Sequence, residues 1–402
     1  MLNTIDLFAG CGGLTEGFKK SGSFKMLAAV EWDKDAHNTL KHRLQSTYGY
    51  KDADARCLLF DIQKIEELIK GYELNEYPSH IGLEKIIAKD TLDLVIGGPP
   101  CQAYSVAGRI RDGNGMQDDY RNYLFESYMK VVDHFQPNAC IFENVPGMLS
   151  AAPGGISIVD RISESFRKSG YVISNNLRLQ ATFDVSEFGV PQKRKRVIIA
   201  AFRDKSFENA NEKVDSFYRA LERHKEDTLN TVGRALSNLP KILPIPSSKA
   251  KESHKVDTGE VDKALDHEPR FHNDRDVKIF RLLAEDIEKE EYKYISTKAL
   301  HALYTEKTGK SSSVHKYHVL RADQPSNTIP AHLYKDGLRH IHPDSKQARS
   351  ITVREAARLQ SFPDDFEFLG SNGSKYKMIG NAVPVLFAQK IAKSLFEVMK
   401  DV

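Results

Sequence analysis

The sequence predicts an α/β protein in which helices surround a mostly parallel sheet and a second, smaller domain follows. Three observations lead to this prediction. Short apolar runs alternate with segments of helical periodicity over residues 1–203. From about residue 204 to residue 345 lysines and acids become more frequent and the alternation stops. At 402 residues the chain is long enough for two or three domains.

The elements of the first segment follow from residue periodicity. Apolar runs predict strands at residues 3–7, 24–30, 56–60, 92–96, 139–142, 171–179 and 196–202. Helical spacing of apolar positions predicts helices at residues 14–21, 34–43, 121–134 and 158–168. Strands that alternate with helices in this way are typical of βαβ units, which build a mostly parallel sheet.

The remaining sequence predicts two further segments. Residues 204–345 contain polar runs such as SSKAKESHK and EKTGKSSS, and we expect them to form the smaller domain. In residues 346–402 regular structure returns. Thr352 and Glu355 there have the spacing of a capping box, which opens a helix that ends before Pro363. Residues 385–399 are predicted as a last helix, and we expect this segment to complete the first domain.

Composition limits the class of protein. A hydrophobic fraction of 40% and a charged fraction of 28% exclude a disordered or collagen-like chain. No apolar run approaches the roughly 20 residues of a membrane span, and the start, MLNTIDLFAGCGG, shows no secretory signal. Cys11, Cys57, Cys101 and Cys140 lack metal-ligand spacing, so we expect a cytoplasmic protein without a metal site. The net charge of +3 is compatible with a polyanionic partner but is too small to establish one.

The stretch DLFAGCGGL, residues 6–14, predicts a ligand-binding turn between the first strand and the first helix. Gly10, Gly12 and Gly13 allow the backbone to approach a ligand that the helix amides face. This G-x-G-G spacing is a weak signal alone, because a tight turn also needs glycine. Glu31 strengthens it, since a carboxylate at the end of the second strand can accept hydrogen bonds from both ribose hydroxyls of a nucleoside. The alternative is a solvated acid at a strand end.

Residues near Glu31 predict the rest of a nucleoside site. Trp32, the only tryptophan, is expected to cover the adenine, although a core position is the alternative. Asp61 and Ile62 follow the third strand, and Asp61 would accept a hydrogen bond from the adenine amino group. No P-loop and no cluster of basic residues accompanies these residues. A nucleoside cofactor with few phosphates therefore suits the site, and S-adenosylmethionine fits that description.

The stretch LDLVIGGPPCQAYS, residues 92–105, places Cys101 directly behind Gly-Gly-Pro-Pro. Residues 92–96 are predicted to be a buried strand, so Cys101 lies in a loop past its carboxyl end. In a parallel sheet that end faces the ligand crevice, which favours a thiol that meets substrate. A buried structural cysteine is the alternative, and this stretch alone leaves both interpretations open.

Taken together, these stretches resemble the cytosine-C5 DNA methyltransferases, over nearly the whole chain and in the motif order of that family. The matching stretches are DLFAGCGGL from Asp6, EWD from Glu31, GGPPCQAYS from Gly97, ENVPG from Glu143, QKRKRV from Gln192, TVREAARLQSFPD from Thr352 and GNAVP from Gly380. One departure is Pro99, because many members have another residue before the Pro-Cys pair. The resemblance implies a Rossmann-like, S-adenosylmethionine-dependent methyltransferase domain at 1–203 and 346–402. It also implies a smaller inserted target-recognition domain at 204–345, with double-stranded DNA as the partner.

The resemblance also implies roles for single residues. Cys101 would attack C6 of a flipped cytosine, because C5 is a poor nucleophile until C6 carries a thiolate. Glu143 would act as an acid toward N3, where negative charge develops, and this role needs a raised pKa of its carboxyl. Burial would raise this pKa and a neighbouring arginine would lower it, and the sequence leaves open which effect is larger. Arg194 and Arg196 would point the same way along a strand, toward the cytosine O2 and its phosphate, while Lys193 and Lys195 face outward. If Cys101 and Glu143 were absent, we would interpret QKRKRV as a solvated, basic strand at the edge of the sheet.

Further contacts are implied by the same resemblance. The cofactor contacts are Phe8, Ala9, Gly10, Gly12, Gly13, Leu14, Glu31, Trp32, Asp61, Ile62, Pro99, Leu124, Asn381, Ala382 and Val383. The DNA contacts are Ser105, Gln192 and Thr328.

Two other functions compete with DNA methylation. A tRNA-methylating branch of the family carries a Cys-Phe-Thr signature in the inserted region, and no cysteine follows Cys140 here. A catalytically silent homologue that only binds DNA or a partner would be expected to lack the nucleophile or the acid, and this sequence keeps both. We expect a monomer, and a cognate restriction endonuclease of the same specificity is a possible partner. The recognition sequence is not predicted.

Overall fold

The computed structural model describes residues 1–88, 90–100, 124–152, 155, 157–245, 252–257, 264–311, 317–335 and 337–400. The chain divides into two compact units. Unit 1 consists of Met1–Gly189, Arg194–Asp227 and Ala382–Val402, and unit 2 of Val190–Lys193 and Thr228–Asn381. This division differs from the segments predicted from the sequence, since residues 204–227 belong to unit 1 and residues 346–381 to unit 2. The functional role of each segment stays a prediction.

An eight-stranded sheet forms the centre of unit 1, with the order β3-β2-β1-β4-β5-β8-β6 and with β7 paired to β8. The strands are β1 (Leu2–Leu7), β2 (Phe24–Glu31), β3 (Cys57–Leu59), β4 (Leu94–Gly97), β5 (Ala139–Asn144), β6 (Tyr171–Ile173), β7 (Thr182–Asp184) and β8 (Lys195–Arg203). β1 to β5 pair in parallel, whereas β8 is antiparallel to β5, β6 and β7. The mostly parallel sheet predicted from the sequence is thereby confirmed. The strand order reverses between β1 and β4, and ligands of such sheets bind beyond the carboxyl ends of the strands at this point.

One predicted strand was wrong in its length. The apolar run at residues 171–179 contains only the three-residue strand β6, after which α9 (Leu177–Gln180) begins. The chain turns into a helix after β6, because the side chain of Asn176 accepts a hydrogen bond from the Leu179 amide and caps α9. The short strand β7 was not predicted.

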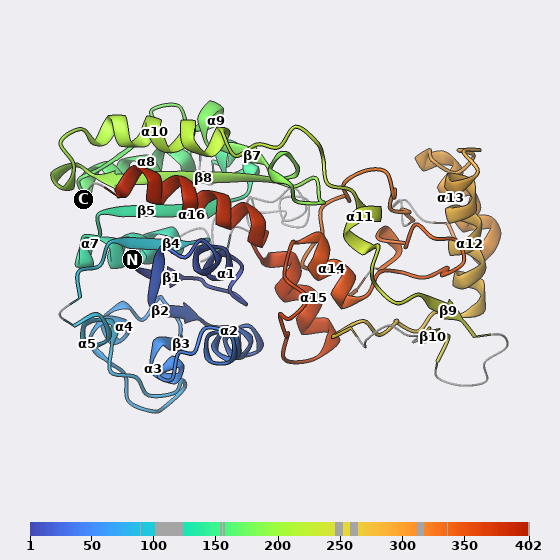
Figure 1. The fold of residues 1–402 in the computed structure, drawn as a ribbon, viewed down its shortest axis with the longest axis horizontal. Helices are drawn as coiled ribbons and strands as arrows, with labels where there is room; N and C mark the ends of the chain where they lie inside the picture. The colour runs from blue at the N-terminus through green and yellow to red at the C-terminus, as the bar shows by residue number, and fades with distance from the viewer. Residues whose placement is uncertain are drawn as a thin grey trace. The chain divides into compact units, whose positions relative to one another are not determined.

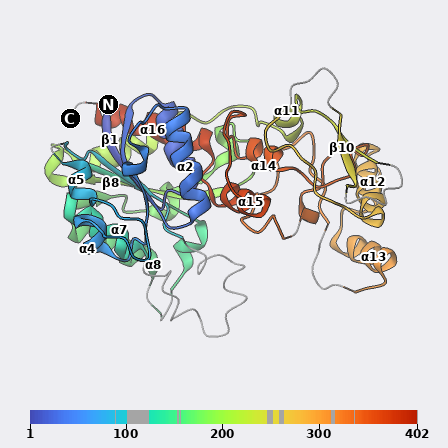
Figure 2. The same ribbon diagram turned by 90° about the horizontal axis from the view of Figure 1, so that it is seen from below.

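Helices cover both faces of the sheet of unit 1. The helices are α1 (Gly13–Lys20), α2 (Lys34–Ser46), α3 (Ala53–Arg56), α4 (Ile65–Lys70), α5 (Leu83–Ile87), α7 (Leu124–Phe135), α8 (Ile158–Lys168), α10 (Ala210–Glu222) and α16 (Val385–Met399), with short 3₁₀ turns at Pro146–Ser150, Val185–Phe188 and Asp204–Ser206. α1, α10 and α16 lie over one face, and α7 and α8 over the other (Figures 1 and 2). A Cβ atom on Gly17 would collide with Ala388, so α1 and α16 pack backbone to backbone. This contact ties the chain end to the helix that follows the glycine loop.

The regular elements of unit 2 are mainly helices, and the unit has its own core. Its elements are α11 (Val232–Leu236), β9 (Ile242–Pro244), β10 (His254–Val256), α12 (Asp274–Glu288), α13 (Thr297–Thr308), the 3₁₀ turn Gly337–Arg339, α14 (Val353–Leu359) and α15 (Asn372–Asn381). α12 and α13 bury Phe280, Leu283 and Leu303 in one apolar cluster. The predicted capping box at Thr352 and Glu355 is confirmed at the start of α14. In the part of the chain that the structure describes, no helix is long and apolar enough to cross a membrane.

Candidate active site

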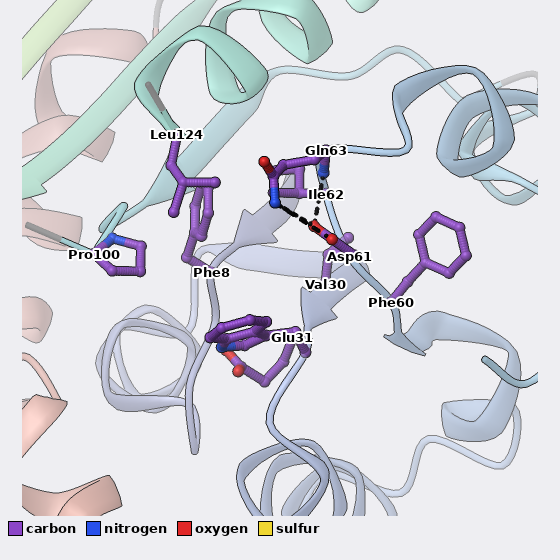
Figure 3. Close-up of a pocket in the computed structure, with 10 residues that line it drawn as sticks. Phe8, Val30, Glu31, Phe60, Asp61, Ile62, Gln63, Pro100 and Leu124 are labelled. Carbon is purple, nitrogen blue, oxygen red and sulfur yellow. Dashed lines mark hydrogen bonds between the residues drawn. The ribbon is translucent and has the colours of Figure 1, made fainter. Parts of the chain in front are cut away.

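A pocket lies beyond the carboxyl ends of β1, β2 and β3, where the strand order predicts a ligand. It has about 360 Å³ of empty volume, part of which is open to solvent. Its lining residues are Phe8, Val30, Glu31, Trp32, Phe60, Asp61, Ile62, Gln63, Pro100 and Leu124 (Figure 3). Six predicted cofactor residues therefore share one pocket: Phe8, Glu31, Trp32, Asp61, Ile62 and Leu124. Phe60, Gln63, Val30 and Pro100 were not predicted.

The glycine loop between β1 and α1 needs its small residues for two physical reasons. Gly12, the N-cap of α1, has a φ of 94°, a left-handed value that favours glycine. A Cβ atom on Gly13 would lie 2.5 Å from the carbonyl oxygen of Val383, so this position lets two backbone segments meet. Val383, a predicted cofactor residue from the chain end, thus lies directly against the loop. Ala9 and Leu14 are buried beside these glycines.

Glu31 is a buried anchor of the pocket wall. Its Oε2 accepts a hydrogen bond from the Gly10 amide at 2.8 Å, and its Oε1 accepts one from the Asp33 amide at 2.8 Å. Burial raises the pKa of this carboxyl, and the backbone hydrogen bonds from Asp33 and Gly10 act in the opposite direction. The side chain is only 8% exposed, so it is not the solvated strand-end acid of the alternative interpretation. Each carboxylate oxygen keeps a further lone pair for a ligand hydroxyl.

The opposite wall of the pocket is built by the turn after β3. Asp61 Oδ1 accepts a hydrogen bond from the Gln63 amide at 2.9 Å and is also contacted by the Gln63 side chain at 3.3 Å. Figure 3 shows these two side chains next to each other, with the Phe8 ring and Leu124 beside them. Trp32 is 56% exposed and lines the pocket, so the alternative that it fills the core is wrong. Phe8 has a φ of 60°, a conformation uncommon for a bulky residue and often found at functional sites.

A second cluster, of charged side chains, lies at the end of β5. Glu143 Oε1 pairs with Arg196 Nε at 2.7 Å, and the two side chains are only 12% and 11% exposed. Glu143 also packs against the backbone of the loop after β4, because a Cβ atom on Gly98 would lie 2.6 Å from Glu143 Oε2. The side-chain amide of Asn144 donates a hydrogen bond to the Pro99 carbonyl at 3.4 Å. The Gly-Gly-Pro-Pro loop is thus held against the buried acid.

The predicted nucleophile follows this loop. Pro100 is the last described residue before a gap, so Cys101 and Ser105 lie outside the described residues.

The balance of effects on Glu143, left open by the sequence, is resolved by burial. Burial raises the pKa of Glu143 above its ordinary value, and the charges of Arg196 and Arg194 only partly oppose it. Burial also lowers the pKa of both arginines, and for Arg194 the charge of Arg196 adds to this effect. A buried carboxyl with a raised pKa beside two guanidinium groups can hold a proton and also stabilise negative charge on a ligand.

The exposure of residues 193–196 follows the predicted alternation. Lys193 and Lys195 are exposed, Arg194 is buried, and Arg196 is partly buried. Arg194 donates from Nη2 to the carbonyl oxygen of Ala382 at 3.3 Å, which links the β8 start to another predicted cofactor residue.

The predicted DNA residues of unit 2 have different surroundings. Gln192 is completely buried. Its Nε2 donates to the Leu359 carbonyl at 3.1 Å and to Gln360 Oε1 at 3.0 Å, and its Oε1 accepts from the Ile329 amide at 2.9 Å. This enclosure gives the Gln192 side chain a scaffolding role inside unit 2, and its DNA contact stays a prediction. Thr328, by contrast, is exposed. Asn381 is the last residue of unit 2.

Comparison with known proteins agrees with this site. Residues 2–397 match the family described as C-5 cytosine-specific DNA methylase. Type II methyltransferase M.Bpa9945I of Bacillus paralicheniformis is 33% identical over 98% of this chain and 98% of that protein. Type II methyltransferase M1.HphI of Haemophilus parahaemolyticus is 30% identical over 98% of this chain and 87% of that protein.

Solved structures show the same fold. A DNA modification methyltransferase encoded within a prophage, from E. coli, matches with a TM-score of 0.64 at 24% identity over 100% of both chains. The S. pombe Dnmt2 methyltransferase matches with a TM-score of 0.56 at 15% identity over 99% of both chains. The buried acid beside the Gly-Gly-Pro-Pro loop, the nucleoside pocket and the match across the whole chain lead to one conclusion. The chain belongs to the C-5 cytosine-specific DNA methylase family and is a DNA cytosine-5-methyltransferase whose methyl donor is S-adenosylmethionine.

Proposed function

We propose that this enzyme methylates C5 of a cytosine that has been flipped out of a specific double-stranded DNA sequence, through a covalent bond between Cys101 and C6. The observation that carries the proposal is the position of Glu143. This buried carboxyl has a raised pKa, is fixed by Arg196 at 2.7 Å, and touches the loop that leads to Cys101. An acid and a thiol would thus act on the same base.

The nucleoside pocket fits S-adenosylmethionine in its chemistry. None of the described residues that line it is a lysine or an arginine, which suits a ligand without a polyphosphate. Glu31 would accept from the ribose hydroxyls, Asp61 would accept from the adenine amino group, and Phe8 and Trp32 offer apolar faces to the base. When bound, the donor supplies an electrophilic methyl group.

The chemistry at the cytosine would be divided among four residues. The Cys101 thiolate adds to C6, which moves electron density onto C5 and N3 and makes C5 nucleophilic. Glu143 delivers a proton or a hydrogen bond to N3 as charge arrives there. Arg196 orients Glu143, and the positive charges of Arg196 and Arg194 stabilise the electron-rich ring at O2. After methylation, a base from the solvent removes the C5 proton, the C5–C6 double bond re-forms as the Cys101 thiolate leaves C6, and the N3 proton returns to Glu143.

Base flipping is part of the proposal because C5 and C6 are hidden in a stacked duplex. Extruding a base costs a few kcal/mol. We assign sequence reading to unit 2, which has its own core and is distinct from the unit that carries the pocket.

The curated relatives M.Bpa9945I and M1.HphI are type II methyltransferases. We therefore also propose a monomer that protects DNA against a restriction endonuclease of the same specificity.

Two substitutions test the mechanism. Cys101→Ala and Glu143→Gln should each reduce cytosine methylation by several orders of magnitude, because one removes the nucleophile and the other removes the transferable proton. Bisulfite sequencing of DNA from cells that express each variant measures the product and its sequence context. The matched control is Cys57→Ala, which replaces a buried thiol of β3 and should leave methylation intact. Normal methylation by Cys101→Ala would overturn the covalent mechanism.

A further inference from the structure

Residues from three distant parts of the sequence meet on one surface of unit 2. The Lys193 amide donates to the Ser326 carbonyl at 2.8 Å, and the Ser326 amide donates to the Pro191 carbonyl at 2.9 Å. The Thr328 hydroxyl then donates to the Lys193 carbonyl at 2.8 Å, across 135 positions of sequence. These bonds fix the backbone of Lys193 beside Thr328.

A third segment joins the same surface through its backbone. The Asn327 side-chain amide donates to the Arg339 carbonyl at 3.3 Å. The ring of His340 contacts the Thr328 carbonyl from Nε2 at 3.2 Å, and a carbonyl can only accept, so this nitrogen carries the proton. His340 itself is buried, with 1% of its surface exposed. The Arg339 carbonyl and the His340 ring therefore hold this segment next to Asn327 and Thr328.

The side chains on this surface are exposed, and two of them, Lys193 and Arg339, are cationic. Lys193, Thr328, His332 and Arg339 are all exposed. Burial, with the charges of His318, Arg339 and His332, lowers the pKa of His340 to about 3.

No described carboxylate forms an ion pair with Lys193 or Arg339. Other cations of unit 2 do have partners: Arg358 pairs with Asp364 at 2.7 Å, and Lys375 pairs with Asp266 at 2.6 Å. Lys193 and Arg339 are thus available to bind an external anion.

We propose that Lys193 and Arg339, together with Thr328 and His332, bind a phosphate group of the DNA backbone. The proposal rests on the proposed function, because DNA supplies the phosphate. An arginine can contact a phosphate with two parallel hydrogen bonds, and a lysine adds a mobile point charge. Contacts of this kind position the protein on a duplex and carry no sequence information. The surface therefore contributes to affinity for any duplex, and its effect depends on salt.

The salt dependence of DNA binding tests the surface directly. Each phosphate contact that is lost should reduce the slope of log Kd against log salt by about 0.9. Fluorescence anisotropy should show this change for Lys193→Gln and for Arg339→Gln, both on a duplex that contains the target sequence and on a duplex of random sequence. Arg339→Lys, which keeps the charge, should retain the wild-type slope, whereas a purely structural arginine would not be replaced in this way.

The matched control is Lys20→Gln. Lys20 is an exposed lysine in the last turn of α1, a helix that starts at the glycine loop and runs away from it. Its slope should equal that of the wild type. Unchanged slopes for both Lys193→Gln and Arg339→Gln would overturn the proposed phosphate contact. Weaker binding to the target duplex alone would also overturn it, because a phosphate contact does not distinguish sequences. Failure of the wild-type protein to bind any duplex would instead overturn the proposed function. Competition by sodium phosphate beyond the effect of an equal ionic strength of sodium chloride would point to a site for free phosphate and would likewise overturn the assignment to DNA.

Discussion

Glu143 combines two requirements that oppose each other in most carboxyl groups. It must be held in one geometry, which the 2.7 Å contact with Arg196 achieves, and it must keep a proton, which a neighbouring cation disfavours. Burial resolves the conflict, because it raises the pKa of Glu143 more than the two arginines lower it. Arg196 therefore orients Glu143 and at the same time lowers its pKa, which favours loss of the proton.

This balance predicts a pH effect. Arg196→Gln removes a charge that lowers the pKa of Glu143, so this pKa should rise further. If the protonated carboxyl is the active form, activity is lost as pH rises through the pKa of Glu143. The alkaline limb of single-turnover methyl transfer should then move to higher pH in Arg196→Gln, although the maximum rate falls. Arg196→Lys keeps a positive charge and should keep the limb near its wild-type position. An alkaline limb that stays in place in Arg196→Gln would show that another group titrates.

Some site residues could be predicted from sequence because their signal is local. Gly12 and Glu31 occupy positions fixed by one strand, one turn and one helix, and the structure places Gly12 at the start of α1 and Glu31 in the lining of the pocket. The partners of Gln192 could not be predicted in this way. Its amide bonds to Leu359 and Gln360, 167 and 168 positions away, and no local pattern reports such partners.

At the scale of elements, the turn after β3 is supported by an aromatic group that the sequence analysis missed. The Phe60 ring precedes Asp61 and lies 4.9 Å from the Tyr72 ring and 5.1 Å from the Tyr77 ring, measured between centroids. Tyr72 and His80 pair their backbones in both directions, at 2.8 and 3.0 Å. The segment that carries these rings thus braces the pocket wall formed by Asp61.

Loss of this brace should weaken the cofactor site selectively. An aromatic pair contributes about 0.5–1.5 kcal/mol beyond burial, so Tyr72→Leu should raise the KM for S-adenosylmethionine by up to about tenfold. The kcat and the KM for DNA should change little, since Glu143 and Arg196 lie elsewhere. Tyr72→Phe keeps the ring and is the matched control. Steady-state kinetics with each substrate varied in turn provides the measurement. An equal loss of kcat and of affinity for both substrates would indicate general unfolding instead.

Elements differ in how far a sequence can specify them. The longer strands β1, β2 and β8 and the helix α16 carry enough apolar residues for the pattern to be read, and all were predicted close to their observed bounds. β7 has three residues and exists because it pairs with β8. A strand of this length is too short to show periodicity, so it could not be predicted from its own residues without knowing its partner strand.

At the scale of the whole molecule, the chain passes between the two units within one motif. In QKRKRV, Gln192 and Lys193 belong to unit 2, and Arg194 begins a segment of unit 1. The shift in composition near residue 204 did not reveal this, because residues 204–227 include α10, which packs against α16 and β8 of the sheet unit. A boundary set by long-range packing leaves little trace in composition.

The two units predict a separation of chemistry from target choice. The pocket, Glu143 and Arg196 all lie in unit 1, so an exchange of residues 228–345 for the corresponding segment of a relative with another specificity should leave the reaction unchanged. The methylated sequence should become that of the donor, because base contacts specify a site whereas phosphate contacts only position the protein. Lys193 is retained in the exchange, so part of the salt-dependent affinity should remain.

Methylome sequencing of cells that express the chimera measures both outcomes at once. The matched control is a chimera that exchanges the same residues with a relative of identical specificity, which should methylate the original site and show that the junctions are tolerated. C5-methylcytosine at the donor sequence alone would place target choice within residues 228–345. Methylation that persists at the original site in the first chimera would mean that unit 1, which already holds the acid and the cofactor pocket, also selects the base.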